Sequence, residues 1–358
     1  MKVSIVGPIK KNAKQGKTNP KIFIYQEALE VLGYQTRLFS VSLPKYKIFS
    51  LIKNLVNSLK YGETILLMLG GGASRTLTGL ILFLNKFYKK RLVLCPFGTG
   101  PLNKLLKDKN SEFVDAFLTQ NKYGRIKDKR MESKLKKLDC VVVQNDVLKN
   151  CFENFYKLKN VVVLKNFRSK SATDSTFEKN SIIYISRVNE EKGILDLMEV
   201  INKHNSDSDK SNNIKLDIYG ENHLENKSLE TFNSLLDENI KYFGTVPNEE
   251  VQMIISRHAI SCLPTKYNGE GTPGFLIESL IAGVPIVVSS FSQVSSIVEN
   301  GFDSIVFKMG DKKSLLQAIL KMLSNEDLLS TFRKNASTSG HKYIFENNIE
   351  TIQKIIEG

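Results

Sequence analysis

The chain has 358 residues, of which 41% are hydrophobic and 25% charged, so it is neither disordered nor fibrous and is long enough for two domains. Its net charge of +14 is unevenly shared, because residues 1–180 carry 34 Lys and Arg against 13 Asp and Glu, whereas residues 181–358 carry 17 against 24. The resulting +21 and −7 predict that the first half faces an anionic partner. A lysine excess that merely solvates exposed helices is the plainer alternative.

Neither secretion nor a membrane span is indicated. The opening "MKVSIVGPIKK" has too short an apolar run for a signal peptide. Residues 64–90 are broken by glycines and Arg75, so we expect a strand, a loop and an apolar helix there, and no transmembrane helix. The unpaired spacing of the cysteines favours buried core residues in a reduced, cytoplasmic protein. They are Cys95, Cys140, Cys151 and Cys262.

Short apolar runs alternate with amphipathic segments along the first half, as in a parallel sheet buried on both faces. Residues 20–33 form one such helical segment, ending at Gly33. The expected strands are 2–7, 36–41, 64–69, 91–95, 140–144 and 160–164.

A polar, Ser- and Lys-containing stretch, residues 169–180, reads as a linker, after which the alternation restarts. Two successive β-α-β series predict two doubly wound α/β domains, whose ligands bind beyond the carboxyl ends of the strands. The second set of expected strands is 181–186, 214–220, 240–244, 259–264, 285–290 and 304–307.

The densest basic region is residues 121–139, which has helical character. On a surface helix, such lysines and arginines favour contact with anionic lipid. Nucleic acid is the other candidate partner of a basic surface, but no recognisable nucleic-acid-binding module is present, so we expect none to bind.

Two glutamates, Glu270 and Glu278, stand in an otherwise apolar stretch, "GEGTPGFLIESLIAGVPIVVSS", residues 269–290. Thr272 followed by Pro273 predicts a helix start, with Thr272 as the N-cap, and the helix is expected to run to Gly283. Glu270 then lies in the preceding loop and Glu278 on the second helical turn. The helix N-terminus is suited to an anion.

The neighbours of Glu278 one turn away are Gly274 and Ala282, which leave room beside the carboxylate. A buried carboxylate needs hydroxyls or cations as partners. Local physics leaves two alternatives open: a ligand site, or a core helix whose glutamate caps the backbone or pairs with a basic residue.

Residues 184–193, "YISRVNEEKG", place Arg187 after a buried strand and Lys192 at the next helix start. Two cations at the carboxyl edge of a sheet suit a diphosphate. The alternative is that both are exposed and pair with Glu190 and Glu191. Together with the glutamates and the helix start, the cations favour a nucleotide-sugar site.

These residues resemble the retaining GT-B glycosyltransferases of family 4, whose signature is two glutamates separated by seven residues, as Glu270 and Glu278 are. The resemblance covers residues 180–340 in order and is looser over the first half, where it rests on the first loop, "IVGPIKKNAKQGKTN", and the strand series. The supporting segments are "SRVNEEKG", "LDIYGE", "YFGTVPNEEV", "SSIVENGFDSIVF" and "DKKSLLQAILKMLSN".

The resemblance implies a GT-B fold of two Rossmann-like domains facing a cleft. The first, residues 1–168, would take the acceptor and be joined by the C-terminal helix, about 342–358. The linker, 169–180, would lead to the donor domain, 181–341.

The resemblance also implies residue roles. Glu278 would bind the ribose hydroxyls, and Glu270 the donor sugar near the reacting carbon. Arg187 and Lys192 would bind the diphosphate. The backbone N–H groups of Gly274, Phe275 and Leu276 would assist, beside Thr272. The chemistry would be sugar transfer with retention through an oxocarbenium-like transition state, with no metal and no cofactor beyond the nucleotide-sugar co-substrate.

The sequence departs from the family pattern in the first half, where many members carry a histidine near the donor sugar. This chain's four histidines all lie after residue 200. Thr99 or its flanking glycines stand where that residue would be. Gly16, Arg75 in "GGGASR" (70–75) and Thr99 are the candidate acceptor-side contacts. Ser186 also replaces the glycine common before the arginine.

We therefore expect a hexosyltransferase that uses a UDP-linked sugar to build a cell-surface glycan, such as capsule or lipopolysaccharide. Its acceptor would be lipid-linked or a polysaccharide, and the protein would be cytoplasmic and peripheral at the inner face of the plasma membrane. The alternatives are a sugar-nucleotide epimerase or glycogen-type synthase, a catalytically silent GT-B partner subunit, and a lipid- or nucleic-acid-binding module.

Overall fold

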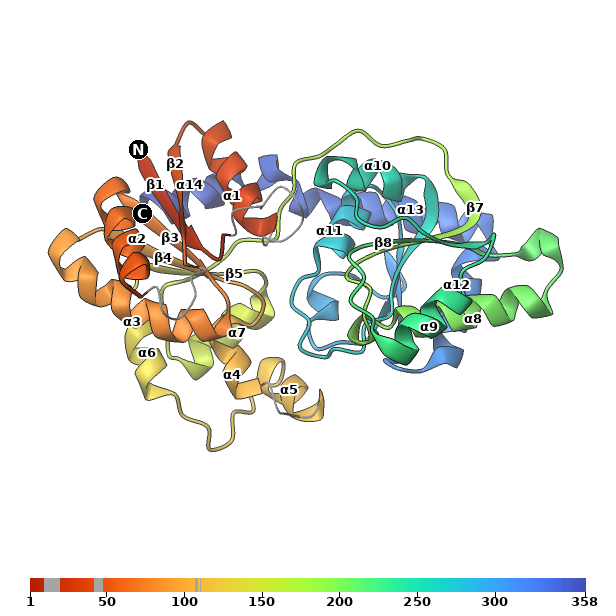
Figure 1. The fold of residues 1–358 in the computed structure, drawn as a ribbon, viewed down its shortest axis with the longest axis horizontal. Coiled ribbons are helices and arrows are strands. Elements are labelled where there is room, and N and C mark those ends of the chain that lie inside the picture. The colour runs from red at the N-terminus through yellow and green to blue at the C-terminus, as the bar shows by residue number, and fades with distance from the viewer. Residues whose placement is uncertain (10–19, 42–47, 107–108, 110) are drawn as a thin grey trace. The chain divides into compact units, whose positions relative to one another are not determined.

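The computed structural model describes residues 1–9, 20–41, 48–106, 109 and 111–358 (Figure 1). The chain divides into two compact units. The first comprises Met1–Lys165 with Asn348–Gly358, and the second comprises Asn166–Asn347. The chain therefore crosses between the units twice, at 165/166 and at 347/348.

The first unit holds a parallel sheet of six strands in the order β2-β1-β3-β4-β5-β6. All six strands expected from the sequence are confirmed, each within one residue of its predicted bounds. The strands are β1 (Lys2–Gly7), β2 (Gln35–Ser40), β3 (Thr64–Leu69), β4 (Arg91–Pro96), β5 (Cys140–Val143) and β6 (Val161–Val163).

Helices alternate with these strands because each β-α-β connection must cross the sheet to return in parallel. The helices are α1 (Pro20–Val31), α2 (Ile48–Tyr61), α3 (Gly71–Tyr88), η3 (Gly100–Leu102), α4 (Asn103–Leu106), α5 (Ser111–Leu118), α6 (Lys129–Leu135), α7 (Asp146–Phe155) and α14 (Ile349–Glu357).

Both chain ends lie in the first unit, because α14 returns to it (Figure 1). The last turn of α14 accepts two hydrogen bonds from the sheet, from Thr64 Oγ1 to the carbonyl of Ile356 at 2.8 Å and from Arg91 Nε to that of Ile355 at 3.1 Å. Ile352, Ile355 and Ile356 are buried, so α14 packs its apolar face into this unit.

One local prediction in the first unit is wrong and another is confirmed only in part. Residues 70–75, expected as a loop, lie mostly in α3, which begins at Gly71 with Gly70 as its N-cap. The basic region 121–139 is helical only over α6, which buries Met131 and Leu135, because the residues before Asp128 form turns rather than a helix.

The second unit holds another parallel sheet of six strands, in the order β12-β11-β10-β7-β8-β9. The expected strands are again confirmed, although β7 begins three residues earlier than predicted, within the stretch read as a linker. The strands are β7 (Glu178–Ile185), β8 (Lys215–Tyr219), β9 (Ile240–Tyr242), β10 (His258–Leu263), β11 (Ile286–Ser289) and β12 (Ser304–Phe307).

The chain builds this sheet outward from β7 to β9 and then restarts on the other side of β7 with β10. The gap between the carboxyl ends of β7 and β10 is therefore the topological switch point, where such sheets bind ligands. The helices are η4 (Glu190–Lys192), α8 (Ile194–Asp207), η5 (Lys210–Asn212), α9 (Asn226–Ser234), η6 (Asn248–Glu250), α10 (Val251–Ser256), α11 (Gly274–Ile281), η7 (Val294–Ser296), α12 (Lys312–Leu323), α13 (Glu326–Gly340), η8 (His341–Tyr343) and η9 (Phe345–Asn348).

Each unit has its own apolar core, and the core prediction for the cysteines is confirmed, because all four are buried. Burial raises the pKa of Cys95 to about 12 and that of Cys140 to about 11, so these thiols stay protonated at neutral pH.

Candidate active site

Helix α11 carries Glu278 and starts one residue later than the sequence predicts. Pro273 is the N-cap and no side chain caps the helix, so the expected Thr272 cap is wrong. The Thr272 hydroxyl is buried without a hydrogen-bond partner among the described residues, while its carbonyl accepts from Asn166 Nδ2 at 3.1 Å. The first N–H groups of α11 have no partner within the helix, as in any α-helix.

The carboxyl end of α11 is a Schellman motif. The N–H of Val284 donates to the carbonyl of Ser279 at 2.9 Å, and that of Gly283 to Leu280 at 3.1 Å. Gly283 has a φ of +69°, which favours glycine. The helix therefore stops within two turns and β11 follows at once, which fixes Glu278 relative to the sheet.

Lys192 and Glu270 meet at the switch point. Lys192 follows β7 and Glu270 follows β10, and the Lys192 ammonium forms an ion pair with Glu270 Oε2. The Lys192 side chain is 9% exposed and that of Glu270 13%. The Thr265 hydroxyl lies 3.4 Å from the same carboxylate oxygen. The structure thus brings together two residues that sequence reasoning placed on one substrate, and it shows them paired with each other.

The alternative pairing of Lys192 with Glu190 or Glu191 is not realised. Instead, the N–H of Lys192 donates to the Asn189 side chain at 3.0 Å, which fixes the start of η4. Gly193 closes the turn with a φ of +71°, and a Cβ there would stand 2.0 Å from the carbonyl oxygen of Pro264. This close approach brings the η4 turn against the end of β10, so glycine is required.

Arg187 lies just beyond β7 and its side chain is exposed, as the alternative to a diphosphate site had it. Its backbone is fixed, because the buried Tyr184 hydroxyl donates to the Arg187 carbonyl at 2.9 Å. The rigid strand end therefore carries a cation on a long, unburied side chain.

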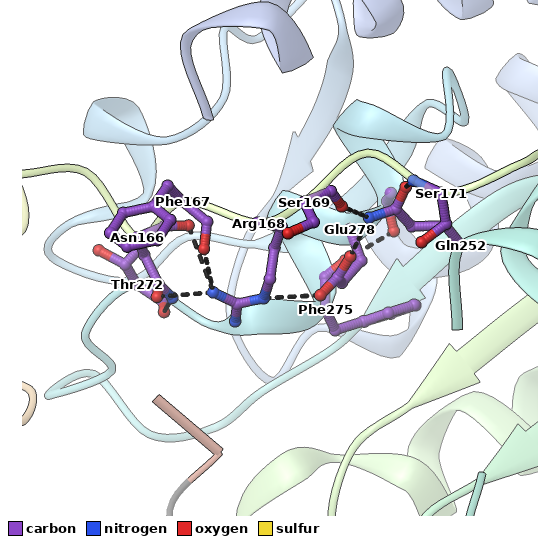
Figure 2. Close-up of polar contacts among 10 residues, drawn as sticks. Asn166, Phe167, Arg168, Ser169, Ser171, Gln252, Thr272, Phe275 and Glu278 are labelled. Carbon is purple, nitrogen blue, oxygen red and sulfur yellow. Dashed lines mark hydrogen bonds and ion pairs between the residues drawn. The ribbon is translucent and has the colours of Figure 1, made fainter. Parts of the chain in front are cut away.

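Glu278 is held by Arg168 and Gln252, neither of which the sequence singled out. Arg168 Nε donates to Glu278 Oε1 at 2.6 Å, and Gln252 Nε2 donates to Oε2 at 2.8 Å (Figure 2). Burial raises the pKa of Glu278, while the charge of Arg168 and both hydrogen bonds act in the opposite direction. The partner predicted for Glu278, a hydroxyl or a cation, is here a cation of the chain itself.

The space beside Glu278 is therefore filled in part by protein. A Cβ at Gly274 would lie 2.6 Å from Arg168 Nη2, so the small residue accommodates the guanidinium. The periodicity of residues 166–171 gave no signal for this contact, because Arg168 precedes Glu278 by 110 residues and sits in an irregular segment.

The segments "LDIYGE" and "YFGTVPNEEV", which the family resemblance implies flank the base of the nucleotide, lie at the carboxyl ends of neighbouring strands. The N–H of Gly220, after β8, donates to the carbonyl of Gly244, after β9, at 2.7 Å. The rings of Tyr219 and Phe243 stack at 5.0 Å. A Cβ at Gly220 would stand 1.8 Å from the carbonyl of Ser186, so β8 and the residue before Arg187 approach closely.

Candidate residues of the first unit lie in different settings. Arg75 forms a bidentate ion pair with Asp128, with contacts of 2.5 and 3.1 Å, and also donates to the carbonyl of Pro101. Thr99, after β4, is buried. Gly16 lies outside the described residues. Arg75 is thus committed to holding its own unit together.

Within the described ranges, no group of three or more His, Cys, Asp or Glu side chains is placed to hold a metal ion. No helix in those ranges combines the length and apolar character required to cross a membrane.

Residues 166–339 match the model of the family described as Glycosyl transferases group 1. The matched range coincides closely with the second unit and includes Arg168, both glutamates and the two cations after β7.

Three similar proteins extend the likeness beyond residues 166–339. An uncharacterised glycosyltransferase of Methanocaldococcus jannaschii is 24% identical over 298 residues, which cover 79% of this chain and 72% of that protein. The structure of Anabaena HepE with UDP and glucose has a TM-score of 0.70 at 11% identity and covers 100% of this chain and 99% of HepE.

A mutant of S. aureus TarM, solved with fondaparinux, α-GlcNAc-glycerol and UDP, has a TM-score of 0.64 at 17% identity. The match covers 86% of this chain and spans only 59% of the length of TarM. Two parallel α/β units with these structural neighbours define the fold as GT-B, as the sequence predicts.

Proposed function

We propose that this chain is a retaining glycosyltransferase of family 4 that moves a hexosyl unit from a UDP-linked sugar to a lipid-linked or polysaccharide acceptor. The observation that carries the proposal is the arrangement around α11. Glu270 stands before its N-terminus and Glu278 on its second turn, and the cation of Lys192 reaches the switch point from β7.

In this proposal the diphosphate of the donor lies at the N-terminus of α11, where unpaired N–H groups and the helix dipole favour an anion. Arg187 and Lys192 would neutralise its charge. Lys192 would then exchange Glu270 for the diphosphate as a partner, which frees the Glu270 carboxylate for the sugar hydroxyls. Glu278 would accept hydrogen bonds from the ribose.

The proposed reaction breaks the bond between the anomeric carbon and the diphosphate oxygen and forms a bond to the acceptor hydroxyl on the same face. The acceptor proton passes to the departing diphosphate. The transition state has oxocarbenium character, so stabilising the charge that develops on the diphosphate is the main catalytic contribution of Arg187, Lys192 and α11. We propose no metal or other cofactor, and activity should survive EDTA.

We further propose that the acceptor is held at an anionic membrane, at the inner face of the plasma membrane. The net charge of +21 over residues 1–180 supports this. So does α3, where Phe83 is 57% exposed and Phe87 75%, and Lys86 lies 6.0 Å from the Phe83 ring centre. Exposed aromatic and basic side chains on one helix suit a lipid interface.

A screen of nucleotide sugars by thermal shift, followed by measurement of slow donor hydrolysis, tests the proposal. A bound ligand at 100 times its dissociation constant stabilises the protein by about 2.7 kcal/mol. We expect a UDP-sugar to give the largest shift and to be hydrolysed by the wild type. Binding without hydrolysis or transfer would instead indicate a catalytically silent partner subunit, which the missing first-unit histidine favours.

A further inference from the structure

The segment that enters the second unit, residues 166–171, is bonded to the body of that unit although its composition resembles a linker (Figure 2). Asn166 Nδ2 donates to the carbonyl of Thr272 at 3.1 Å. Gln252 Nε2 donates to the carbonyl of Ser169 at 2.9 Å, and the N–H of Ser171 donates to Gln252 Oε1 at 2.8 Å. The segment therefore has a defined place against α10 and α11.

The backbone of Arg168 is fixed on both sides by the chain segment that later leaves this unit. Its N–H donates to the carbonyl of Tyr343 at 2.9 Å, and its carbonyl accepts from the N–H of Phe345 at 2.9 Å. The buried rings of Phe167 and Phe345 pack at 5.9 Å between centres. The backbone of Arg168 is therefore held in place where the segment that enters this unit contacts the segment that leaves it.

The guanidinium of Arg168 is oriented by more than its ion pair. While Nε donates to Glu278, Nη1 donates to Asn166 Oδ1 at 2.9 Å and to the carbonyl of Phe167 at 2.7 Å. Nη2 lies against Gly274. Because the group is planar, these contacts determine the direction in which Nε meets the carboxylate.

Gln252 has only one amide orientation that satisfies its neighbours. The N–H of Ser171 can only donate, so Oε1 must face it, and Nε2 must then face Ser169 and Glu278. Gln252 is buried, and reversing its amide would leave a carbonyl oxygen against a carboxylate. The second oxygen of Glu278 is therefore also directed by a fixed donor.

Each oxygen of Glu278 receives one hydrogen bond from the protein, whereas a carboxylate accepts about four. About two acceptor positions remain, and the side chain keeps 14% of its surface exposed. Two acceptor positions match the two donors of a vicinal diol such as that of a ribose. The contacts to Arg168 and Gln252 thus leave the carboxylate able to bind a ligand.

We propose that Arg168 is a positioning residue that keeps Glu278 ionised and aligned for a ribose diol, with Gln252 fixing the second carboxylate oxygen. The inference rests on the proposed function in that it takes Glu278 as the ribose-binding group. The inference adds Arg168, from the segment that enters the second unit, to the proposed donor site. The geometry of that site then depends on how residues 166–171 pack against the unit.

The proposal predicts a pH signature because Glu278 has a single charged partner. Among the described residues, Arg168 is the charged group that lowers the pKa of Glu278, and α10 contributes the uncharged Gln252. Helix α13 also packs against α11, but its Arg333 donates to the carbonyls of His258 and Ala259. Without Arg168, a buried carboxylate has no cation to offset its desolvation and takes up a proton more readily. A protonated Glu278 loses acceptor capacity for the diol.

The experiment measures the dissociation constant of UDP for full-length wild type, Arg168→Met and Arg168→Lys by calorimetry from about pH 6 to about pH 9. At each pH, the dissociation constant of the variant is divided by that of the wild type. This ratio cancels the effect of the titration of UDP itself. For Arg168→Met we expect a ratio of about tenfold at the acid end that shrinks toward the alkaline end. Arg168→Lys restores a cation, so its ratio should be flat. The control is Lys179→Met, which breaks an exposed ion pair with Glu326 and should give a ratio near one.

A ligand-free readout separates this inference from the proposed function. In urea unfolding, Glu278→Gln introduced into Arg168→Met should restore stability, because it removes the unpaired buried carboxylate. Wild type that binds UDP through Glu278 while Arg168→Met shows a pH-independent ratio near one would overturn the positioning role and leave the function standing. Wild type that binds no UDP would overturn the function, whereas the unfolding cycle would still report whether Arg168 and Glu278 are coupled.

Discussion

The two units share one architecture but use charge differently. In the second unit, charged side chains at the carboxyl edge of the sheet are buried in pairs, Lys192 with Glu270 and Arg168 with Glu278. In the first, Arg75 holds Asp128 beside α6, and most of the lysines whose side chains the structure describes are exposed. These arrangements suit the roles that we propose: a paired charge can be exchanged for a charged ligand, and exposed lysines can attract an anionic surface.

The largest effect should come from the pair at the switch point. Glu270→Gln should reduce sugar transfer by about a thousandfold, because a positioned group near the reacting carbon is lost. Initial rates with a UDP-sugar give the measurement, with the exposed Glu249→Gln as control. Sugar transfer at the wild-type rate by Glu270→Gln would contradict a role for this carboxylate of the second unit in the reaction.

Backbone packing at the same place gives the next largest effect. Gly193→Ala should lower the free energy of unfolding by about 3 kcal/mol or more, since its Cβ would meet the Pro264 carbonyl at 2.0 Å. Gly310→Ala is the matched control, with a similar φ of +75° and open space around it, and should cost about 1 kcal/mol. Equal costs in urea unfolding would show that the close approach is not rigid.

Arg75 tests whether a cation of the first unit is structural. Arg75→Met should destabilise the protein by about 2 kcal/mol, because Asp128, whose side chain is 7% exposed, loses its partner. Lys136→Met breaks an exposed pair with Glu132 and should cost about 0.5 kcal/mol or less. UDP affinity should be unchanged in both, and a loss of affinity in Arg75→Met alone would move Arg75 into the donor site.

The positive charge of the first unit should cause the protein to bind anionic membranes. Vesicles containing anionic lipid should bind the protein, and raising salt should weaken binding, whereas neutral vesicles should not bind. Replacing Phe83 and Phe87 by Ala should reduce vesicle binding about tenfold. The control is Phe243→Ala in the second unit, which is 50% exposed. Equal loss in both variants would argue against α3 as the contact.

The smallest expected effect is the pH dependence of stability from Glu278. Its pKa is raised by burial, so the native state binds this proton more tightly than the unfolded state. The contribution is therefore fully present below the unfolded pKa and is lost as pH rises through the folded pKa. Glu278→Gln should remove that dependence. The free energy of unfolding of the variant, measured relative to that of the wild type, should therefore increase as pH rises.

The fold followed from the sequence because parallel strands buried on both faces form nearly continuous apolar runs. All twelve expected strands are present, and 304–307 has the predicted bounds. Local chemistry was less readable. Thr272 looked like a helix cap, yet Pro273 takes that position, since a one-residue shift leaves the periodicity of α11 unchanged.

The motif residues around Glu270 and Glu278 were also predictable, because their spacing is local. Arg168 and Gln252 were not, because Arg168 contacts Glu278 from an irregular segment 110 residues away and Gln252 from another helix, α10. The sequence left open whether Glu278 meets a ligand or a basic residue, and the structure supplies the basic residue. The roles assigned to these residues in binding a donor remain predictions.

The central claim is that the second unit binds a uridine diphosphate through Glu278. Calorimetric titration of UDP into wild type and into Glu278→Ala at one neutral pH tests it most directly. We expect saturable binding to the wild type and an affinity at least about tenfold lower for the variant, a loss of about 1.4 kcal/mol. Equal affinities, or a wild type that does not bind UDP, would contradict it.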